Sequence, residues 1–229
     1  LRLTWQEIAG APGIVVHVSI APAEDGLAWR LSVDGLHGGA ALWQADFPLL
    51  EGLSPIGEGD DERLLLPMRG GYVVRNVAGA RLSPLEEDAA CFSYPCDLTM
   101  QFVARYQEGG DGLLLMAQDA AGYTKRFCLR RGVAGGRRWA LAVEHFPEGM
   151  PQAEGRYSPP YPIVLTAFSG DWMDAAACYR AWATRQPWCA RGPLHARGDI
   201  PAWLFENGLW VWNRGPSDKV LPGVRRVRE

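Results

Sequence analysis

Between residues 14 and 170 the chain is a succession of short apolar and β-branched segments separated by Gly, Pro, Asp and Asn. Short segments bounded by such turn formers are typical of β-strands. No ten-residue helical pattern interrupts them, which excludes alternating βαβ units. About ten strands at this spacing predict an antiparallel β-sandwich. The expected strands are 14–20, 27–33, 40–47, 63–68, 72–77, 98–106, 112–119, 123–131, 137–146 and 161–168.

The clearest alternation of apolar and polar residues runs from Leu98 to Tyr106. The even positions are apolar, whereas positions 99, 101 and 105 are polar. Because successive side chains of a strand point to opposite faces, we expect one buried face and one wetter face.

The pattern changes at Gly170, where a strong helical signal begins. Asp171 is a good N-cap, Asp174 places negative charge in the first turn, and Pro187 ends the helix. The residues at helical spacing on the expected buried face are Trp172, Ala175, Ala176, Tyr179, Trp182 and Ala183.

A linker rich in Pro and Gly follows, and residues 208–213 are expected to form a short buried strand. Six of the ten tryptophans lie after Gly170, which suggests a seam between domains. The chain opens on Leu1 and closes shortly after Gly223, so we expect both ends to be cut from a longer protein. The expected organisation is a β-sandwich over 1–170, a junction helix and linker over 171–200, and the start of a truncated (β/α)8 barrel over 201–229.

Charge and composition exclude several classes of protein. The 229 residues carry a formal net charge of -3, whereas a nucleic-acid surface needs a basic field. No run approaches the roughly 20 apolar residues of a membrane-spanning helix. Nucleotide-binding Gly-rich loops and the G-x-S-x-G hydrolase signature are absent. We therefore expect neither a nucleic-acid nor a membrane partner.

Five cysteines are an odd number in a chain too long to depend on disulfides. We expect buried free thiols. Cys91 and Cys96 are the alternative pair, which requires the loop between them to turn back tightly. No C-x-x-C spacing is present and the four histidines are scattered, so no cofactor is expected. Calcium bound by backbone and carboxylate oxygens stays open.

The first candidate site is the hairpin from Gln118 to Phe127. Lys125 shares a strand face with Tyr123, Phe127 and Leu129, where an unpaired charge is costly. Asp119 is its natural partner across the turn. Such a pair could bind sugar hydroxyls or position a domain edge; alternatively it is a structural ion pair, or Lys125 extends to water at the sheet rim.

The second candidate site lies among the late tryptophans. Sugars present apolar C–H faces that stack on indole rings, so aromatic-lined sites suit glycans. Trp210 and Trp212 lie on one face of the expected strand, and Asn213 and Arg214 follow at its carboxyl end. If this strand opens a (β/α)8 barrel, these residues lie where such barrels hold their active sites. A packed strand end is the alternative.

Paired catalytic carboxylates are not recognisable. A glycosidase needs two, separated by a sugar-sized gap. Glu144, Asp199 and Glu206 have no visible partner, and the acidic clusters at 60–62 and 86–88 lie in polar loops. The sequence therefore shows no complete active site.

Several short motifs resemble one family. They are Phe47-Pro-Leu-Leu50, Tyr94 to Phe102, Asp119 to Phe127, Tyr161-Pro, and the junction Gly170 to Trp182 with Gln186-Pro-Trp188. Together they resemble the N-terminal half of a glycoside hydrolase-related family. In that family a galactose-mutarotase-like β-sandwich precedes a (β/α)8 catalytic barrel, as in α-galactosidase-like and endo-α-N-acetylgalactosaminidase-like enzymes.

The resemblance implies a role in carbohydrate processing. It places the catalytic acids on later barrel strands, and therefore outside these residues. We expect a non-catalytic N-terminal sandwich and junction that packs against a following catalytic domain and has carbohydrate as its partner. A stand-alone carbohydrate-binding module and a purely structural or interaction domain are the alternatives.

Overall fold

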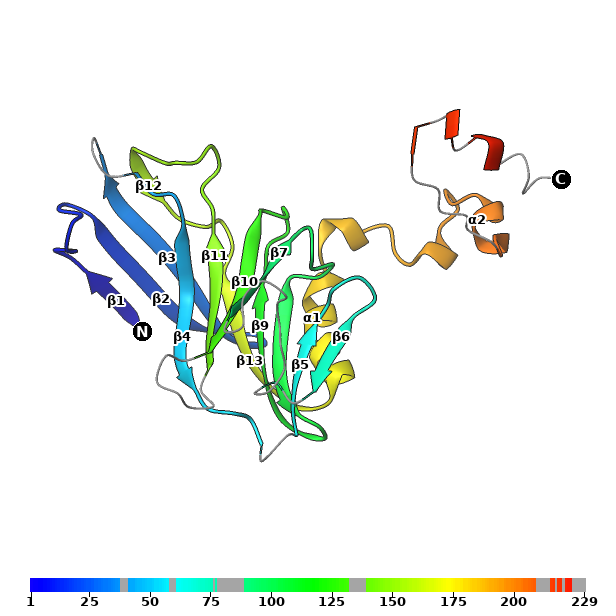
Figure 1. Cartoon of the computed structure of the whole chain (residues 1–229), viewed down its shortest axis with the longest axis horizontal. Coiled ribbons are helices and arrows are strands. Elements are labelled where there is room, and N and C mark those ends of the chain that lie inside the picture. The colour runs from blue at the N-terminus through cyan, green and yellow to red at the C-terminus, as the bar shows by residue number, and fades with distance from the viewer. Residues whose placement is uncertain are drawn as a thin grey trace. The chain divides into compact units, whose positions relative to one another are not determined.

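The computed structural model describes residues 1–37, 41–57, 61–75, 77, 89–131, 139–208, 215–216, 218–219 and 221–223. The chain divides into two compact units, Leu1–Pro187 and Trp188–Glu229. The first unit contains two antiparallel sheets and a helix, which confirms the expected mainly-β sandwich (Figure 1).

The larger sheet has nine strands in the order β1-β2-β3-β13-β9-β8-β5-β6, with β12 also paired to β3. Its strands are β1 (Arg2–Trp5), β2 (Val15–Ala23), β3 (Gly26–Leu36), β5 (Glu62–Leu66), β6 (Tyr72–Arg75), β8 (Phe102–Gln107), β9 (Gly110–Ala117), β12 (Gly155–Tyr157) and β13 (Ile163–Gly170). The smaller sheet has the order β4-β11-β10-β7. Its strands are β4 (Ala45–Leu53), β7 (Ala89–Tyr94), β10 (Lys125–Arg131) and β11 (Trp139–His145).

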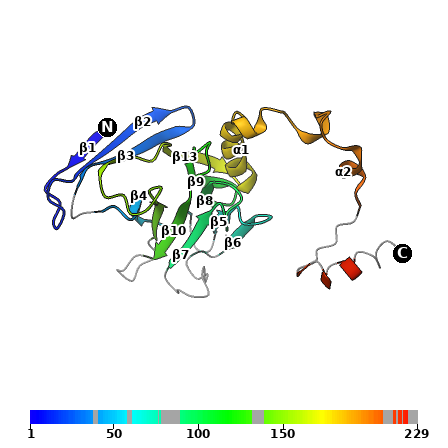
Figure 2. The same cartoon turned by 90° about the horizontal axis from the view of Figure 1, so that it is seen from above.

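The larger sheet is covered on both faces along β8 and β9. One face packs on the smaller sheet, where Val103 and Leu115 meet Phe127 and Val143. The other face packs on helix α1 (Trp172–Ala183). Figure 2 shows α1 on the side of the larger sheet opposite to β7 and β10. The first unit therefore has three layers.

This double cover overturns the expected wetter face at Gln101 and Arg105, whereas Thr99, which precedes β8, is exposed as predicted. Gln101 and Arg105 are both buried. The Arg105 guanidinium pairs with the buried carboxylate of Glu62 and donates to the Ser54 carbonyl at 3.3 Å. Buried polar groups are tolerated because these partners replace water.

Helix α1 begins as its sequence predicts. The Asp171 side chain accepts the Met173 N–H at 2.6 Å, and the Asp174 carboxylate accepts the Asp171 N–H at 2.9 Å, which completes a capping box. Gly170 has φ +125°, and a Cβ there would lie 1.9 Å from Asp174 Oδ2. Only glycine fits this junction.

The buried stripe of α1 is narrower than expected. Ala175, Tyr179 and Trp182 are buried, whereas Trp172 is 47% exposed. Trp172 is the first residue of α1, and it is not among the residues that pack with these three on the larger sheet. The other expected members of the face, Ala176 and Ala183, are half-buried. The prediction that Trp172 belongs to the core was wrong.

Strand β4 also differs from its prediction. The expected strand ended at Phe47 before Pro48, but β4 runs from Ala45 to Leu53 and contains Pro48. Strand β4 lies at the edge of the smaller sheet. Pro48 is tolerated there, because one side of an edge strand has no partner strand to which an N–H would donate.

The prediction of buried free thiols was wrong for all five cysteines, since two form a disulfide and the three free ones are exposed or half-buried. Cys91 on β7 and Cys128 on β10 lie directly opposite each other and form a disulfide, with Cα atoms 4.1 Å apart. Cys96, Cys178 and Cys189 are free thiols, so the alternative Cys91–Cys96 pair does not form. The two bonded residues are 37 positions apart, and only the pairing of β7 with β10 brings them together.

Past Pro187 the described residues form short helical segments. They are η1 (Pro187–Cys189), η2 (Leu194–Ala196) and α2 (Ala202–Glu206). The expected strand over 208–213 falls almost entirely outside the described residues. Among the helices that the structure describes, none has the length and apolar character needed to cross a bilayer.

Candidate functional site

The loop between β9 and β10 is organised by the Asp119 carboxylate. Its Oδ1 accepts the N–H groups of Ala121 at 2.9 Å and Gly122 at 3.1 Å, and its Oδ2 accepts that of Tyr123 at 2.6 Å. Aspartate commonly shapes turns in this way, because its short side chain reaches the backbone of the next residues. The loop is therefore held from inside by one buried side chain.

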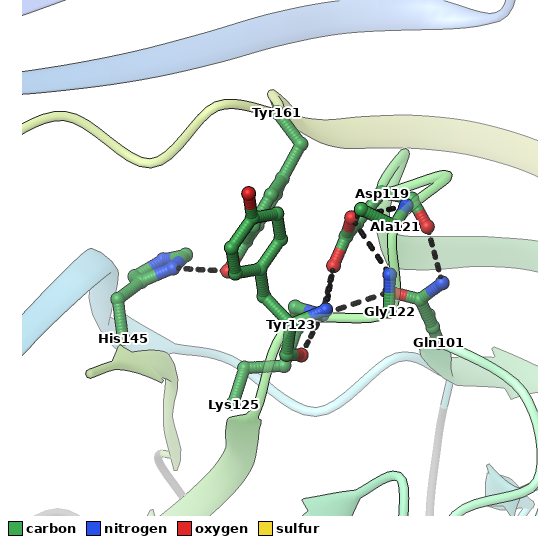
Figure 3. A network of polar contacts seen from close by, with 8 residues as sticks. All are labelled: Gln101, Asp119, Ala121, Gly122, Tyr123, Lys125, His145 and Tyr161. Atoms are coloured by element: carbon green, nitrogen blue, oxygen red, sulfur yellow. Dashed lines mark hydrogen bonds and ion pairs between the residues drawn. The ribbon is translucent and has the colours of Figure 1, made fainter. Parts of the chain in front are cut away.

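Lys125 completes this network at the first residue of β10. Its ammonium donates to Asp119 Oδ2 at 2.7 Å, Gln101 Oε1 at 2.9 Å and the Tyr123 carbonyl at 2.5 Å (Figure 3). Gln101 in turn donates to the Asp119 carbonyl at 2.8 Å. All three ammonium protons thus have acceptors. Burial lowers the pKa of Lys125, and the bond to Asp119 opposes that shift.

Aromatic rings enclose the same cation. The Lys125 ammonium lies 4.6 Å from the ring centre of Tyr161 and 4.8 Å from that of Tyr94. Cation–π attraction at these distances further stabilises a desolvated charge. Burial raises the pKa of the Tyr161 hydroxyl, so this residue stays neutral beside the cation.

His145, opposite Lys125 in the sheet register, extends the network to the other side of Tyr161. Its Nε2 lies 2.6 Å from the Phe47 carbonyl and its Nδ1 lies 2.9 Å from the Tyr161 hydroxyl. A carbonyl only accepts, so Nε2 carries the proton and Nδ1 accepts from Tyr161. Burial lowers the pKa of His145 to about 4, which keeps the ring neutral near pH 7. The geometry makes His145 a structural residue.

Above this network the surface is hollowed into an open pocket of about 750 Å³. Its aromatic walls are Trp43, Tyr123 and Phe146. Trp43 is 60% exposed. The remaining lining residues are Gln44, Ser93, Ala121, Gly122, Thr124, Arg126, Pro147, Glu148 and Met150. Residues 121–124 form one wall, so the Asp119–Lys125 network fixes the shape of this pocket.

A second pocket of about 390 Å³ adjoins the first, and Tyr123, Phe146 and Glu148 line both. Its other lining residues are Gln152, Arg156, Tyr157, Ser158, Pro159, Pro160 and Tyr161. Aromatic rings that line a pocket beside mixed hydrogen-bond donors and acceptors suit the two faces of a sugar. We call the two pockets together the aromatic pocket.

The acids near the aromatic pocket do not form a catalytic pair. Glu148 is the sole carboxylate among the described residues that line it. The nearby Glu144 is buried and paired with Arg126 at 2.5 Å and Arg130 at 3.0 Å. Hydrolysis of a glycosidic bond needs two carboxyl groups across the sugar. This arrangement therefore suits binding better than hydrolysis.

The structure brings together one of the two predicted site groups. The expected Asp119–Lys125 pair forms, with Asp119 1% and Lys125 0% exposed. The carboxylate and the ammonium are thus both hydrogen-bonded within the protein interior, which favours the interpretation of the pair as a structural ion pair. Trp210, Trp212, Asn213 and Arg214 lie outside the described residues.

Sequence reasoning did not identify the aromatic walls. Trp43 precedes β4, Tyr123 lies in the loop before β10, and Phe146 follows β11. The sequence contains no spacing that links these three segments. Sheet pairing brings them together, since β11 lies between β4 and β10.

Comparison with known proteins gives a partial match to one family model and a structural likeness. Residues 157–229, less than half of the chain, match the model of a domain of unknown function, DUF6259. No curated protein matches the chain. Two similar solved structures are the α-N-acetylgalactosaminidase NagBb from Bifidobacterium bifidum, in its complex with GalNAc (TM-score 0.55, 13% identity) and ligand-free (TM-score 0.54, 12% identity). Each match covers 80% of this chain and 28% of that chain. About four fifths of this chain therefore share their fold with part of that enzyme, and the match spans 28% of the enzyme's length.

Proposed function

We propose that this chain is a non-catalytic, carbohydrate-binding region of a glycoside hydrolase-like protein. The observation that carries the proposal is the aromatic pocket, whose rings stand beside polar groups on a wall that the buried Asp119–Lys125 pair holds rigid. The likeness to part of NagBb supports a setting in carbohydrate processing.

The proposal gives α1 the role of a junction. The helix is capped at Gly170–Asp174 and packed on the larger sheet by Tyr179 and Trp182. A helix fixed in this way can hold a following domain at a constant position. In the proposed protein that domain is a (β/α)8 catalytic barrel, in which Trp210, Trp212, Asn213 and Arg214 are candidate sugar contacts on the first strand.

Titration of the 229-residue chain with galacto-oligosaccharides and GalNAc glycosides tests the binding role, with tryptophan fluorescence and calorimetry as readouts. Replacing Trp43 by Ala removes the most exposed ring of the pocket. We expect Trp43→Ala to weaken binding by about threefold to tenfold, the range of one lost aromatic contact. Trp172→Ala is the matched control, because Trp172 is also exposed but lines neither pocket.

The outcomes separate three roles. Binding that Trp43→Ala weakens and Trp172→Ala leaves unchanged supports the proposal. Binding that neither variant alters would place the sugar site elsewhere. Absence of binding to every glycan would favour a structural or interaction domain. Release of sugar from an aryl α-glycoside by the chain alone would contradict its non-catalytic role. We expect no release, because Glu148 has no second carboxylate opposite it among the described residues that line the pocket.

A further inference from the structure

The face of β1–β3 that points away from the smaller sheet is polar and carries two arginines in line. Arg2 on β1 lies opposite Ser19 on β2, and Ser19 lies opposite Arg30 on β3. The two arginines thus stand on one face with a serine between them, about 10 Å apart at the backbone, twice the usual strand spacing.

The neighbouring charges on this face are already paired. The Asp34 carboxylate lies 3.3 Å from Arg156 and 3.6 Å from His17, and it accepts the Ser32 hydroxyl at 2.9 Å. Arg2 and Arg30 have no anionic partner among the residues that the structure describes. Like charges so close on one face repel each other, and the pair therefore favours an anion between them.

The two arginines line a pocket of about 440 Å³ together with Ser19, His17 and Asp34. Arg156 and Ser158 belong to the lining of this pocket and also to that of the aromatic pocket. The two pockets therefore adjoin at Arg156 and Ser158. Adjoining pockets can hold successive sugar units of one chain.

We propose that Arg2 and Arg30 hold an anionic substituent, a sulfate ester or a carboxylate, of a glycan whose neutral units occupy the aromatic pocket. The inference rests on the proposed carbohydrate-binding function. Guanidinium groups suit both substituents, because each offers several donors in one plane to two or more oxygens. The chain as a whole has a net charge of -3, so attraction of anions to this face comes from these local cations.

The test compares matched oligosaccharides that are neutral, O-sulfated or terminated by a uronic acid, with inorganic sulfate as a fourth probe. Calorimetry at low salt measures their affinities for the wild-type chain and for the double variant Arg2→Gln/Arg30→Gln. Arg69→Gln/Arg75→Gln is the control, since it makes the same change in net charge on the exposed β5–β6 hairpin, away from the pocket. Thermal unfolding checks that both variants are folded.

We expect the wild-type chain to bind the acidic oligosaccharides at least about fivefold more tightly than the neutral one, an advantage that salt reduces. Arg2→Gln/Arg30→Gln should abolish this preference and leave the neutral affinity unchanged, whereas the control variant keeps it. Preference for the sulfated or the uronic oligosaccharide identifies the substituent.

Equal affinity for acidic and neutral oligosaccharides would overturn the inference, and so would an equal loss of preference in the control variant. Failure of the proposed function is distinguishable, because it appears as absence of binding to the neutral oligosaccharide. In that case, binding of inorganic sulfate that Arg2→Gln/Arg30→Gln abolishes would support the anion site and contradict the glycan site.

Discussion

At the scale of single residues, the molecule uses its basic side chains according to geometry. Of the 23 lysines and arginines only two are lysines, Lys125 and Lys219. Lys125 is the one that is fully buried. Three acceptors converge on one point there, and a compact ammonium fits them, whereas a planar guanidinium needs acceptors spread around its edge. The wall of the aromatic pocket thus depends on a fully buried side chain.

His145 makes the stability of the fold depend on pH. Its pKa is about 4 in the folded chain, below the ordinary 6.5, so the unfolded chain binds more protons between these values. The contribution of neutral His145 to the free energy of unfolding is fully present above pH 6.5 and is lost as the pH falls through 4. We expect a loss of about 3 kcal/mol from this residue, at 1.36 kcal/mol for each pKa unit. Urea unfolding at pH 7.5 and pH 4 measures it.

The His145→Gln variant isolates this effect, because its amide N–H can still donate to the Phe47 carbonyl while the side chain cannot titrate. Its stability should fall less than that of the wild-type chain between the two pH values. His195→Gln, at an exposed histidine, is the control. An equal fall in all three proteins would show that His145 is not the group that titrates.

At the scale of elements, α1 is attached by one narrow stripe. Trp182 is buried against the larger sheet, and truncation of a buried tryptophan typically costs about 3–5 kcal/mol. We therefore expect Trp182→Ala to lower the free energy of unfolding by that amount in urea titration. Trp172→Ala, ten residues earlier at the exposed first residue of α1, should change it by less than about 0.5 kcal/mol. Similar losses in both variants would mean that the helix contributes through its propensity rather than its packing.

The elements also show which features a sequence can predict. The N-cap at Asp171 and the pairing of Asp119 with Lys125 were predictable, because each involves residues within one turn or one hairpin. The Cys91–Cys128 disulfide and the buried Arg105 were not, since both depend on which strands and helices become neighbours. The aromatic pocket could not be predicted for the same reason, because its walls come from three separate segments. Interactions between residues close in the sequence can be predicted from a single sequence, whereas contacts between distant segments cannot.

At the scale of the whole molecule, the hydrophobic core formed by the described residues lies in one of the two units. Every residue of the three buried apolar clusters lies before Pro187. The described residues of the second unit instead expose large apolar side chains, including Trp188, Leu194, Trp203 and Phe205. The first unit should therefore fold without the second.

Truncation after Pro187 tests this division. We expect residues 1–187 to unfold in one transition with a Tm within about 2 °C of the full chain, since the three buried clusters of the described residues lie wholly within this segment. Binding of a hydrophobic dye should fall, because the exposed aromatic residues of the second unit are gone. A Tm lower by more than about 5 °C would mean that residues 188–229 stabilise the sandwich directly. That result would contradict the independent folding of residues 1–187.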